Sequence, residues 1–290
     1  MHEVGAQGTQ LSAGDRGFPV FHAARCGGLG ELDGHLVGCR ACPRLVAWRE
    51  KVATTKRAGF QGWEYWGRPV PGFGPHDAPL AVVGLAPAAH GANRTGRMFT
   101  GDASGDFLFA ALHAVGLASR PTATAADDGL ELYGVRVTSP VHCAPPANKP
   151  TPEERDTCRP WLAAEITLLN PRAIVVLGGF SWQALLPVLA DCGWRLPRPR
   201  PRFAHGNAVT LRRAEPRAAR PADAGRSEHG GRATDDELHV IGCYHPSQRN
   251  TFTGRLTSPM LIDLLHQAAH LAGLGGRPDA LGPGPGPPSP

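Results

Sequence analysis

Four short apolar runs are spaced along the chain, and each is bounded by glycine, proline or polar residues. They are PLAVVGLAP at 79–87, YGVRVTSPV at 133–141, AIVVLGG at 173–179 and ELHVIGCYHPS at 237–247. Continuous runs of this length, rich in valine and isoleucine, are typical of strands that are buried on both faces of a parallel sheet. The pattern therefore predicts four parallel strands.

Apolar residues at helical spacing occur before, between and after these runs. The segments are PRLVAWREKV at 43–52, SGDFLFAALHAVG at 104–116, 151–169, FSWQALLPVLA at 180–190 and 258–273. The third of them opens with a capping box formed by Thr151 and Glu154, and Pro160 is expected to kink or split it. Alternating strands and helices predict an α/β sheet, in which ligands bind beyond the carboxyl ends of the strands.

Three segments lack this periodicity and contain few large apolar side chains. They are the glycine-rich residues 1–33, the polar residues 214–237 and residues 274–290, which end in GPGPGPPSP. Such segments bury too little apolar area to offset the entropy lost on ordering. We therefore predict one domain at 34–273 with a disordered insertion at 214–237, between disordered tails at 1–33 and 274–290.

The composition, 41% hydrophobic and 19% charged, is typical of a soluble globular protein. No apolar run approaches the roughly 18 residues of a membrane helix, and the first residues show no signal-peptide pattern, so we expect a cytoplasmic protein. The formal net charge of +5 is compatible with a phosphate-containing partner such as nucleic acid.

Seven cysteines in a chain without an export signal argue for thiols that are free or bind metal. Four of them lie on proline-rich loops beside predicted strand and helix ends: Cys39, Cys42, Cys143 and Cys158. Together they can form a tetrahedral sulfur site for zinc or for a four-iron cluster. The alternative is that Cys143 and Cys158 are ordinary buried side chains. The other three have no predicted role: Cys26 in the tail, Cys192 at a helix end and Cys243 in a strand.

The first apolar run continues into GLAPAAHGANRTGRMFTGDASGD, residues 84–106. Glycine and alanine at a strand end let backbone amides approach a flat or anionic ligand, and Phe99 can stack on it. Neither a GxGxxG nor a Walker pattern is present, which disfavours a loop for nucleotide phosphates.

The last run continues into YHPSQRNTFTGR, residues 244–255. His245, at the carboxyl end of the predicted strand, can donate a hydrogen bond to negative charge that develops on a leaving group. The alternative is that His245 caps a local carbonyl.

These motifs resemble those of the uracil-DNA glycosylase superfamily, and within it the iron-sulfur enzymes of family 5, or type b. The resemblance rests on GLAPAAHGANRTGR (motif A), on HPSQRN and on the order of the four cysteines, and it covers residues 36–272. It implies a three-layer fold with a four-stranded parallel sheet flanked by helices. It also implies a [4Fe-4S] cluster on the four cysteines, and a monomer that removes damaged bases from double-stranded DNA. Uracil and related bases such as hypoxanthine are the substrates it implies.

The resemblance also implies roles for individual residues. The motif A backbone would bind the base edge through Gly84, Leu85, Ala86, Pro87, Ala88 and Ala89. Phe99 would stack on the base, and His245 would hydrogen-bond to its O2 atom. Better-known relatives place Asp or Asn where this chain has Ala88, so the group that orients water is open. Asp102 is the preferred carboxylate, with helix capping as its alternative role. Asn148 is a second candidate, or else a turn former.

DNA contacts are expected from the segment that follows the last strand. This segment is expected to act as a wedge between bases and as a clamp on the DNA backbone. Its candidate residues are Ser247, Gln248, Arg249, Asn250 and Arg255. Arg94, Arg97 and Lys149 are further candidates for phosphate contacts. Two other functions remain open: a strictly uracil-specific enzyme of family 4, and a noncatalytic DNA-binding protein that holds zinc or an iron-sulfur cluster.

Overall fold

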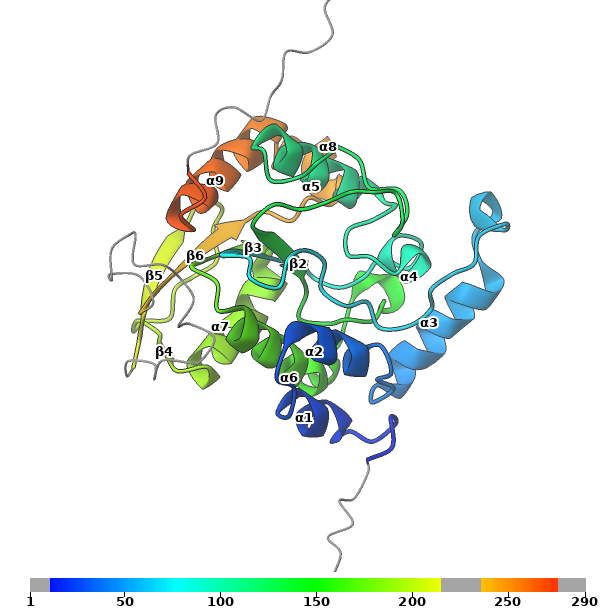
Figure 1. Ribbon diagram of the computed structural model, residues 1–290. Coiled ribbons are helices and arrows are strands. Elements are labelled where there is room, and N and C mark those ends of the chain that lie inside the picture. The colour runs from blue at the N-terminus through cyan, green and yellow to red at the C-terminus, as the bar shows by residue number, and fades with distance from the viewer. Residues whose placement is uncertain (1–10, 215–235, 276–290) are drawn as a thin grey trace, which may run out of the picture.

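A central sheet with helices on both faces forms the core of the computed structural model, which describes residues 11–214 and 236–275 (Figure 1). Its strands are β1 Leu80–Val83, β2 Val135–Thr138, β3 Ala173–Leu177, β4 Trp194–Arg195, β5 Ala208–Arg213 and β6 Glu237–Cys243. Its α-helices are α1 Phe18–Ala23, α2 Leu29–Leu36, α3 Pro43–Thr55, α4 Ala92–Thr95, α5 Ala103–Ala114, α6 Pro152–Leu169, α7 Gly179–Asp191, α8 Gln248–Phe252 and α9 Ser258–Leu271. Single 3-10 turns are formed by Ala58–Phe60 and Pro146–Asn148.

The strand order is β2-β1-β3-β6-β5-β4, and the first four strands are parallel. They correspond to the four apolar runs, so the predicted parallel sheet is confirmed. Two antiparallel strands, β5 and β4, extend it beyond β6 and were not predicted. The reason lies in their sequences, because β4 has two residues and β5 is largely exposed, with only Leu211 buried.

Successive residues of the parallel strands enter two different cores. Val82 and Val175 pack in the core that α5 and α9 cover, whereas Val83 and Val176 pack in the core beneath α6 and α7. Each strand is therefore apolar at every position, because both faces of the sheet are covered. Within the described ranges, no helix has the length and apolar character needed to cross a bilayer.

Helix α6 begins with the predicted capping box. The backbone amide of Glu154 donates to Thr151 Oγ1 at 3.2 Å, and the amide of Thr151 donates to Glu154 Oε2 at 2.8 Å. The predicted split at Pro160 does not occur, since α6 is one helix from Pro152 to Leu169. Trp161 and Leu162 lie directly after the proline and are buried in the core. Packing of these side chains stabilises the helix across the missing amide.

The prediction of a disordered tail at 1–33 is wrong for the described residues 11–33, which include α1 and the start of α2. Phe18 packs against Trp161 of α6, with ring centroids 6.2 Å apart, and Leu29 and Leu32 are buried in the same core. Tertiary packing thus orders a segment whose glycines suggested a linker. Residues 1–10, 215–235 and 276–290, which hold most of the predicted disorder, lie outside the described residues.

A buried arginine connects the N-terminal helices to the sheet. Arg136 of β2 is 1% exposed; its Nε donates to Glu165 of α6 at 2.6 Å, and its Nη2 donates to Asp33 of α2 at 2.8 Å. Thr138 Oγ1 donates to the second oxygen of Glu165 at 2.5 Å. Burial raises the pKa of Asp33, and the Arg136 guanidinium opposes that rise. This network fixes α2 and α6 in position on one face of the sheet.

Replacing Arg136 with methionine should destabilise the fold, because the Glu165 carboxylate would stay buried without its cation. We expect the free energy of unfolding to fall by about 3–5 kcal/mol in urea denaturation. Arg155→Met is the matched control: Arg155 pairs with Asp156, whose side chain is 56% exposed, and its loss should cost at most about 1 kcal/mol. Equal losses in the two variants would contradict a structural role for the buried network.

Candidate active site and metal centre

Phe99 and His245 face each other at the carboxyl edge of the sheet. Their ring centroids are 6.1 Å apart, and the ring planes differ by 31°. Phe99 follows the motif A loop after β1, and His245 follows β6; both strands pair with β3. Two segments far apart in sequence thus contribute to one site, as expected for the ends of parallel strands.

The position of the Phe99 ring depends on a glycine behind it. A Cβ at residue 84 would lie 2.5 Å from the ring, so only glycine allows this approach. Phe99 itself adopts a left-handed backbone conformation with φ of +53°. Such a conformation is unfavourable for a non-glycine residue by about 1–3 kcal/mol, and it persists only where the surroundings determine it.

The motif A backbone offers amides to a ligand, although not every residue that was predicted to do so. The amide of Gly84 donates to Thr138 O at 2.7 Å and is therefore occupied, while Pro87 has no amide hydrogen. Of the six residues predicted to bind the base edge, four are half-buried and have amides without a protein acceptor among the described residues: Leu85, Ala86, Ala88 and Ala89. Partly buried amides rarely remain unpaired, so these four are suited to a ligand or water.

Asp102 caps α5, the alternative role that the sequence suggested for it. Its Oδ1 accepts hydrogen bonds from the amides of Ser104 at 2.9 Å and Gly105 at 3.0 Å, which caps α5. Its Oδ2 points to the motif A loop, where a Cβ at residue 91 would lie 2.1 Å from it. Burial raises the pKa of Asp102, and the two amides and Arg94 oppose the rise. One oxygen therefore caps the helix, and the other lies against motif A.

His245 is held as a neutral imidazole. Burial lowers its pKa to about 4, because the charged form loses solvation. Its backbone carbonyl accepts a hydrogen bond from Asn250 Nδ2 at 2.9 Å, which fixes the start of the following loop. A neutral imidazole at this position can donate a hydrogen bond without carrying a charge.

The segment after His245 forms the short helix α8. Gln248 and Arg249 are exposed on it, and Ser247 immediately precedes it. Arg255 lies over the ring of Tyr244, 4.5 Å from its centroid. Phe252 is 81% exposed, although it is a large apolar side chain. Its exposure was not predicted from the sequence, where the one available signal was an aromatic residue within a polar segment.

Arg94 and Arg97 were expected to contact phosphates, and the structure contradicts this. They are 3% and 5% exposed. Arg97 makes a bidentate pair with Asp128 at 2.9 and 2.7 Å, and the pair holds the pKa of that carboxyl well below its usual range. Arg94 lies 4.1 Å from the ring centroids of both Phe60 and Trp63, and it donates to a backbone carbonyl. Both guanidiniums have their partners inside the protein, where they organise the loops around motif A.

Asn148 and Lys149 lie on the exposed turn between β2 and α6. Asn148 has a left-handed backbone with φ of +54°, a conformation that asparagine tolerates in turns. The carbonyl of Lys149 accepts a hydrogen bond from Arg44 Nη2 at 3.2 Å, which connects this turn to α3. The geometry is that of a turn former, the alternative considered for Asn148, and Lys149 remains an exposed cation.

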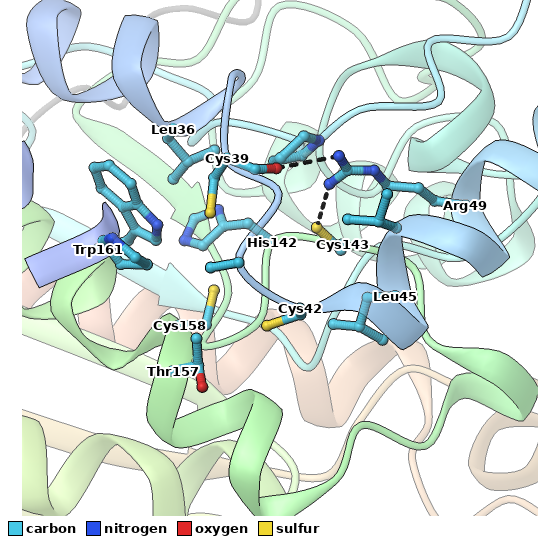
Figure 2. Close-up of a pocket in the computed structure, with 14 residues that line it drawn as sticks. Leu36, Cys39, Cys42, Leu45, Arg49, His142, Cys143, Thr157, Cys158 and Trp161 are labelled. Carbon is cyan, nitrogen blue, oxygen red and sulfur yellow. Dashed lines mark hydrogen bonds between the residues drawn. The ribbon is translucent and has the colours of Figure 1, made fainter. Parts of the chain in front are cut away.

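The four predicted cysteines line one cavity, which Figure 2 shows. Cys39 and Cys42 come from the connection between α2 and α3, Cys143 follows β2, and Cys158 belongs to α6. The remaining lining is largely apolar and includes Pro19, Leu36, Leu45 and Trp161. Burial raises the pKa of Cys42 to about 12 and that of Cys143 to about 11, and neighbouring cysteines reinforce both shifts. Thiolates in this cavity therefore require a positive partner.

Arg49 of α3 supplies a positive charge beside this cavity. It is 1% exposed; its Nη1 donates to Cys143 Sγ at 2.8 Å, and its Nη2 donates to the Cys39 carbonyl at 3.1 Å (Figure 2). His142 also lines the cavity; its Nδ1 bonds to Val70 O, and its buried Nε2 has no partner among the described residues. Neither side chain was identified from the sequence, because their partners lie far away along the chain.

Comparisons with known proteins agree with this geometry. A family model described as the uracil DNA glycosylase superfamily matches residues 71–269. A type-5 uracil-DNA glycosylase of Mycobacterium bovis is 50% identical over 254 residues, which are 87% of this chain and 85% of that protein. A type-5 uracil-DNA glycosylase of Thermus thermophilus is 48% identical over 240 residues, or 82% of this chain and 96% of that protein.

The match to type-4 proteins is more limited. A type-4 uracil-DNA glycosylase of Pyrobaculum aerophilum is 35% identical over 121 residues, which are 41% of this chain and 54% of that protein. The type-5 relatives, in contrast, align over most of the domain. The chain therefore belongs to the uracil-DNA glycosylase superfamily and, within it, to the type-5 family.

Proposed function

We propose that this protein is a monofunctional DNA glycosylase of base-excision repair, acting as a cytoplasmic monomer on double-stranded DNA. It would hydrolyse the N-glycosidic bond of uracil and of related deaminated bases such as hypoxanthine. The observation that carries the proposal is the facing pair of Phe99 and His245 at one edge of the sheet, with their ring centroids 6.1 Å apart. The type-5 relatives support uracil as the substrate.

Binding of the base begins with its removal from the stack. Unstacking and unpairing cost a few kcal/mol, least for a mismatched pair such as U·G, which supplies part of the selectivity. Stacking of the base on the Phe99 ring contributes roughly 1–3 kcal/mol. The unpaired amides of Leu85, Ala86, Ala88 and Ala89 can then donate to the edge of the base.

Cleavage of the glycosidic bond places negative charge on the base and positive charge on the sugar. His245, as a neutral imidazole, donates a hydrogen bond to the base O2 and stabilises the first charge. The Asp102 carboxylate stabilises the second charge and orients the attacking water through Oδ2, since Oδ1 caps α5. Water then adds to the anomeric carbon as the bond to the base nitrogen breaks. The Asp102 carboxylate accepts the proton that the water loses, and the base leaves as an anion that is protonated by solvent.

The loop and helix after His245 form the contact with DNA in this proposal. The exposed ring of Phe252 is suited to enter the stack that the flipped base leaves, as apolar wedges do in other DNA-binding proteins. Gln248 lies beside the vacated position, and Arg249, Arg255 and Lys149 bind phosphates. Asn250 keeps the loop in place through its bond to the His245 carbonyl.

A [4Fe-4S] cluster is the metal group that we propose for the four cysteines. Among the described residues, only Cys26, Glu31 and His35 form a group of three possible metal ligands within 4.8 Å of one another. No three of the four cysteine sulfurs are therefore that close together. Zinc-sulfur bonds of about 2.3 Å would require sulfur separations of about 4 Å, so a multi-atom cluster suits this cavity better than one zinc ion. The Arg49 guanidinium can stabilise its negative charge. The cluster would connect the segment at 39–42 to α6, a structural role.

Single-turnover assays on U·G and hypoxanthine-containing duplexes test the activity. We expect abasic sites with the wild type and a loss of roughly 10²–10³ in rate for His245→Ala, with DNA affinity retained. Asp102→Asn should show a similar loss, because asparagine still caps α5 but has no carboxylate. Asp106→Asn, in the same first turn, serves as the matched control and should excise normally.

Three results would count against the proposal. A normal rate for Asp102→Asn would remove its role with water. Binding of the U·G duplex without abasic-site formation by the wild type would support a noncatalytic DNA-binding protein. Excision confined to uracil would favour the narrower specificity considered for family 4.

The protonation of His245 gives a test that depends on pH. Its pKa in the folded protein is about 4, below the usual 6.5, so it should remain neutral until the pH falls toward 4. Because the unfolded chain takes up this proton first, the group should lower stability progressively as the pH falls below about 6.5. Histidine-selective NMR, with the signal assigned through His245→Gln, should show no titration of this ring between pH 8 and 5.5. A midpoint near 6.5 would contradict the assigned neutral donor.

Metal analysis tests the cluster. Protein purified anaerobically should be brown and contain iron, and Cys158→Ser should lose both the colour and folding stability, because Cys158 lines the cavity. Cys192→Ser, which changes a cysteine outside the cavity at the end of α7, should keep the iron. Zinc in place of iron, lost in the Cys158 variant, would overturn the assignment.

A further inference from the structure

A second group of metal-binding side chains lies at the junction of α1 and α2, apart from the four-cysteine cavity. Cys26 Sγ, a carboxylate oxygen of Glu31 and a ring nitrogen of His35 all lie within 4.8 Å of one another. Cys26 belongs to the loop between the two helices, and Glu31 and His35 lie four residues apart on α2. This group was not predicted from the sequence, because Cys26 lies in the segment 1–33 that was expected to be disordered.

The carboxylate of Glu31 is already oriented for such a role. Its Oε2 accepts a hydrogen bond from the amide of Gly27 at 2.8 Å, which leaves Oε1 directed to the imidazole, 3.9 Å from His35 Nε2. Metal bonds of about 2.0–2.3 Å place the donor atoms of a tetrahedral zinc site about 3.5 Å apart. A shift of a few tenths of an ångström would bring the Glu31 and His35 atoms to this spacing. Cys26 Sγ, which lies within 4.8 Å of both, would have to approach by at most about 1.3 Å.

A further imidazole lies close by on α1, although its ring nitrogens are not within 4.8 Å of all three donor atoms. The ring of His22 lies 4.4 Å from the ring of His35, centroid to centroid. Cys26 Sγ donates a hydrogen bond to the backbone carbonyl of His22 at 3.2 Å, which places the loop beside α1.

We propose that Cys26, Glu31 and His35 bind one zinc-like divalent transition-metal ion, with His22 or water as the fourth ligand. Sulfur and imidazole nitrogen select such an ion over magnesium or calcium, which prefer oxygen ligands. The side chains of His35 and Glu31 are 40% and 51% exposed, so the ion can exchange with solvent. The proposal does not depend on the glycosylase activity.

The expected effect of the ion is to fix α1 against α2. Pro19 of α1 and Leu36 of α2 both line the four-cysteine cavity, and Cys39 follows α2 after two residues. An ion that binds the folded chain but not the unfolded chain raises the free energy of unfolding as the logarithm of the ion concentration increases. Binding at Cys26 would therefore stabilise the helical cover of the cavity.

Cobalt can be used as a probe, because a Co²⁺-thiolate bond gives a charge-transfer absorption. Co²⁺ is titrated into the anaerobically purified full chain with its iron content measured. The wild type should show the band with one equivalent, and Cys26→Ser should abolish it. His35→Gln should weaken binding by more than about tenfold, a loss seen even when residues around a metal site are changed. Cys192→Ser, another half-buried cysteine, should leave the band unchanged.

Two further measurements separate this site from the cavity and from misfolding. The iron content of Cys26→Ser should equal that of the wild type, and Zn²⁺ should raise the melting temperature of the wild type but not of this variant. Glu31→Gln changes an exposed side chain and provides the same comparison if Cys26→Ser does not fold. A band that persists in Cys26→Ser, a band lost in Cys192→Ser or the absence of cobalt binding would overturn the proposal.

Discussion

The active site depends on β3, which is hydrogen-bonded to β1 on one side and to β6 on the other. Its residue Ala173 pairs with Leu80 and with His239, so the three parallel strands end at one edge of the sheet. Motif A starts immediately after β1, and His245 lies two residues after β6. Both faces of these strands are buried, so a slip of one residue would move every side chain into the opposite core. Both close-packed cores would then have to repack, which is strongly disfavoured. The register of the sheet therefore sets the distance between Phe99 and His245.

The sequence alone predicted those features of the fold that depend on local pattern. The parallel strands were visible as continuous apolar runs, and the capping box of α6 as Thr151 and Glu154. Helices α1 and α2 were missed, because they are stabilised by packing against α6, which lies more than 100 residues later in the chain. Strand β5 was missed for a different reason: its side chains are mostly exposed, with only Leu211 buried, so its sequence lacks the continuous apolar run of a core strand.

The same distinction applies to the functional residues. Residue types and spacing were enough to identify the four cysteines and to suggest that Phe99 and His245 share a site, because these residues lie beside strand and helix ends. The roles of the arginines could not be predicted, since charge alone does not reveal a partner. Arg97 pairs with Asp128, and Arg49 reaches Cys143, 94 positions away along the chain. Both pairs are brought together by the tertiary fold and not by proximity in sequence.

The left-handed backbone of Phe99 affects how tightly the site can hold a ligand. The ring is fixed against Gly84 in a conformation that the residue would seldom adopt in an unfolded chain. The entropy of immobilising this side chain is thus lost during folding and not during association. A preorganised platform contributes its full contact energy to an incoming partner, while the folded state is correspondingly less stable. Affinity at this position is obtained at the expense of conformational stability.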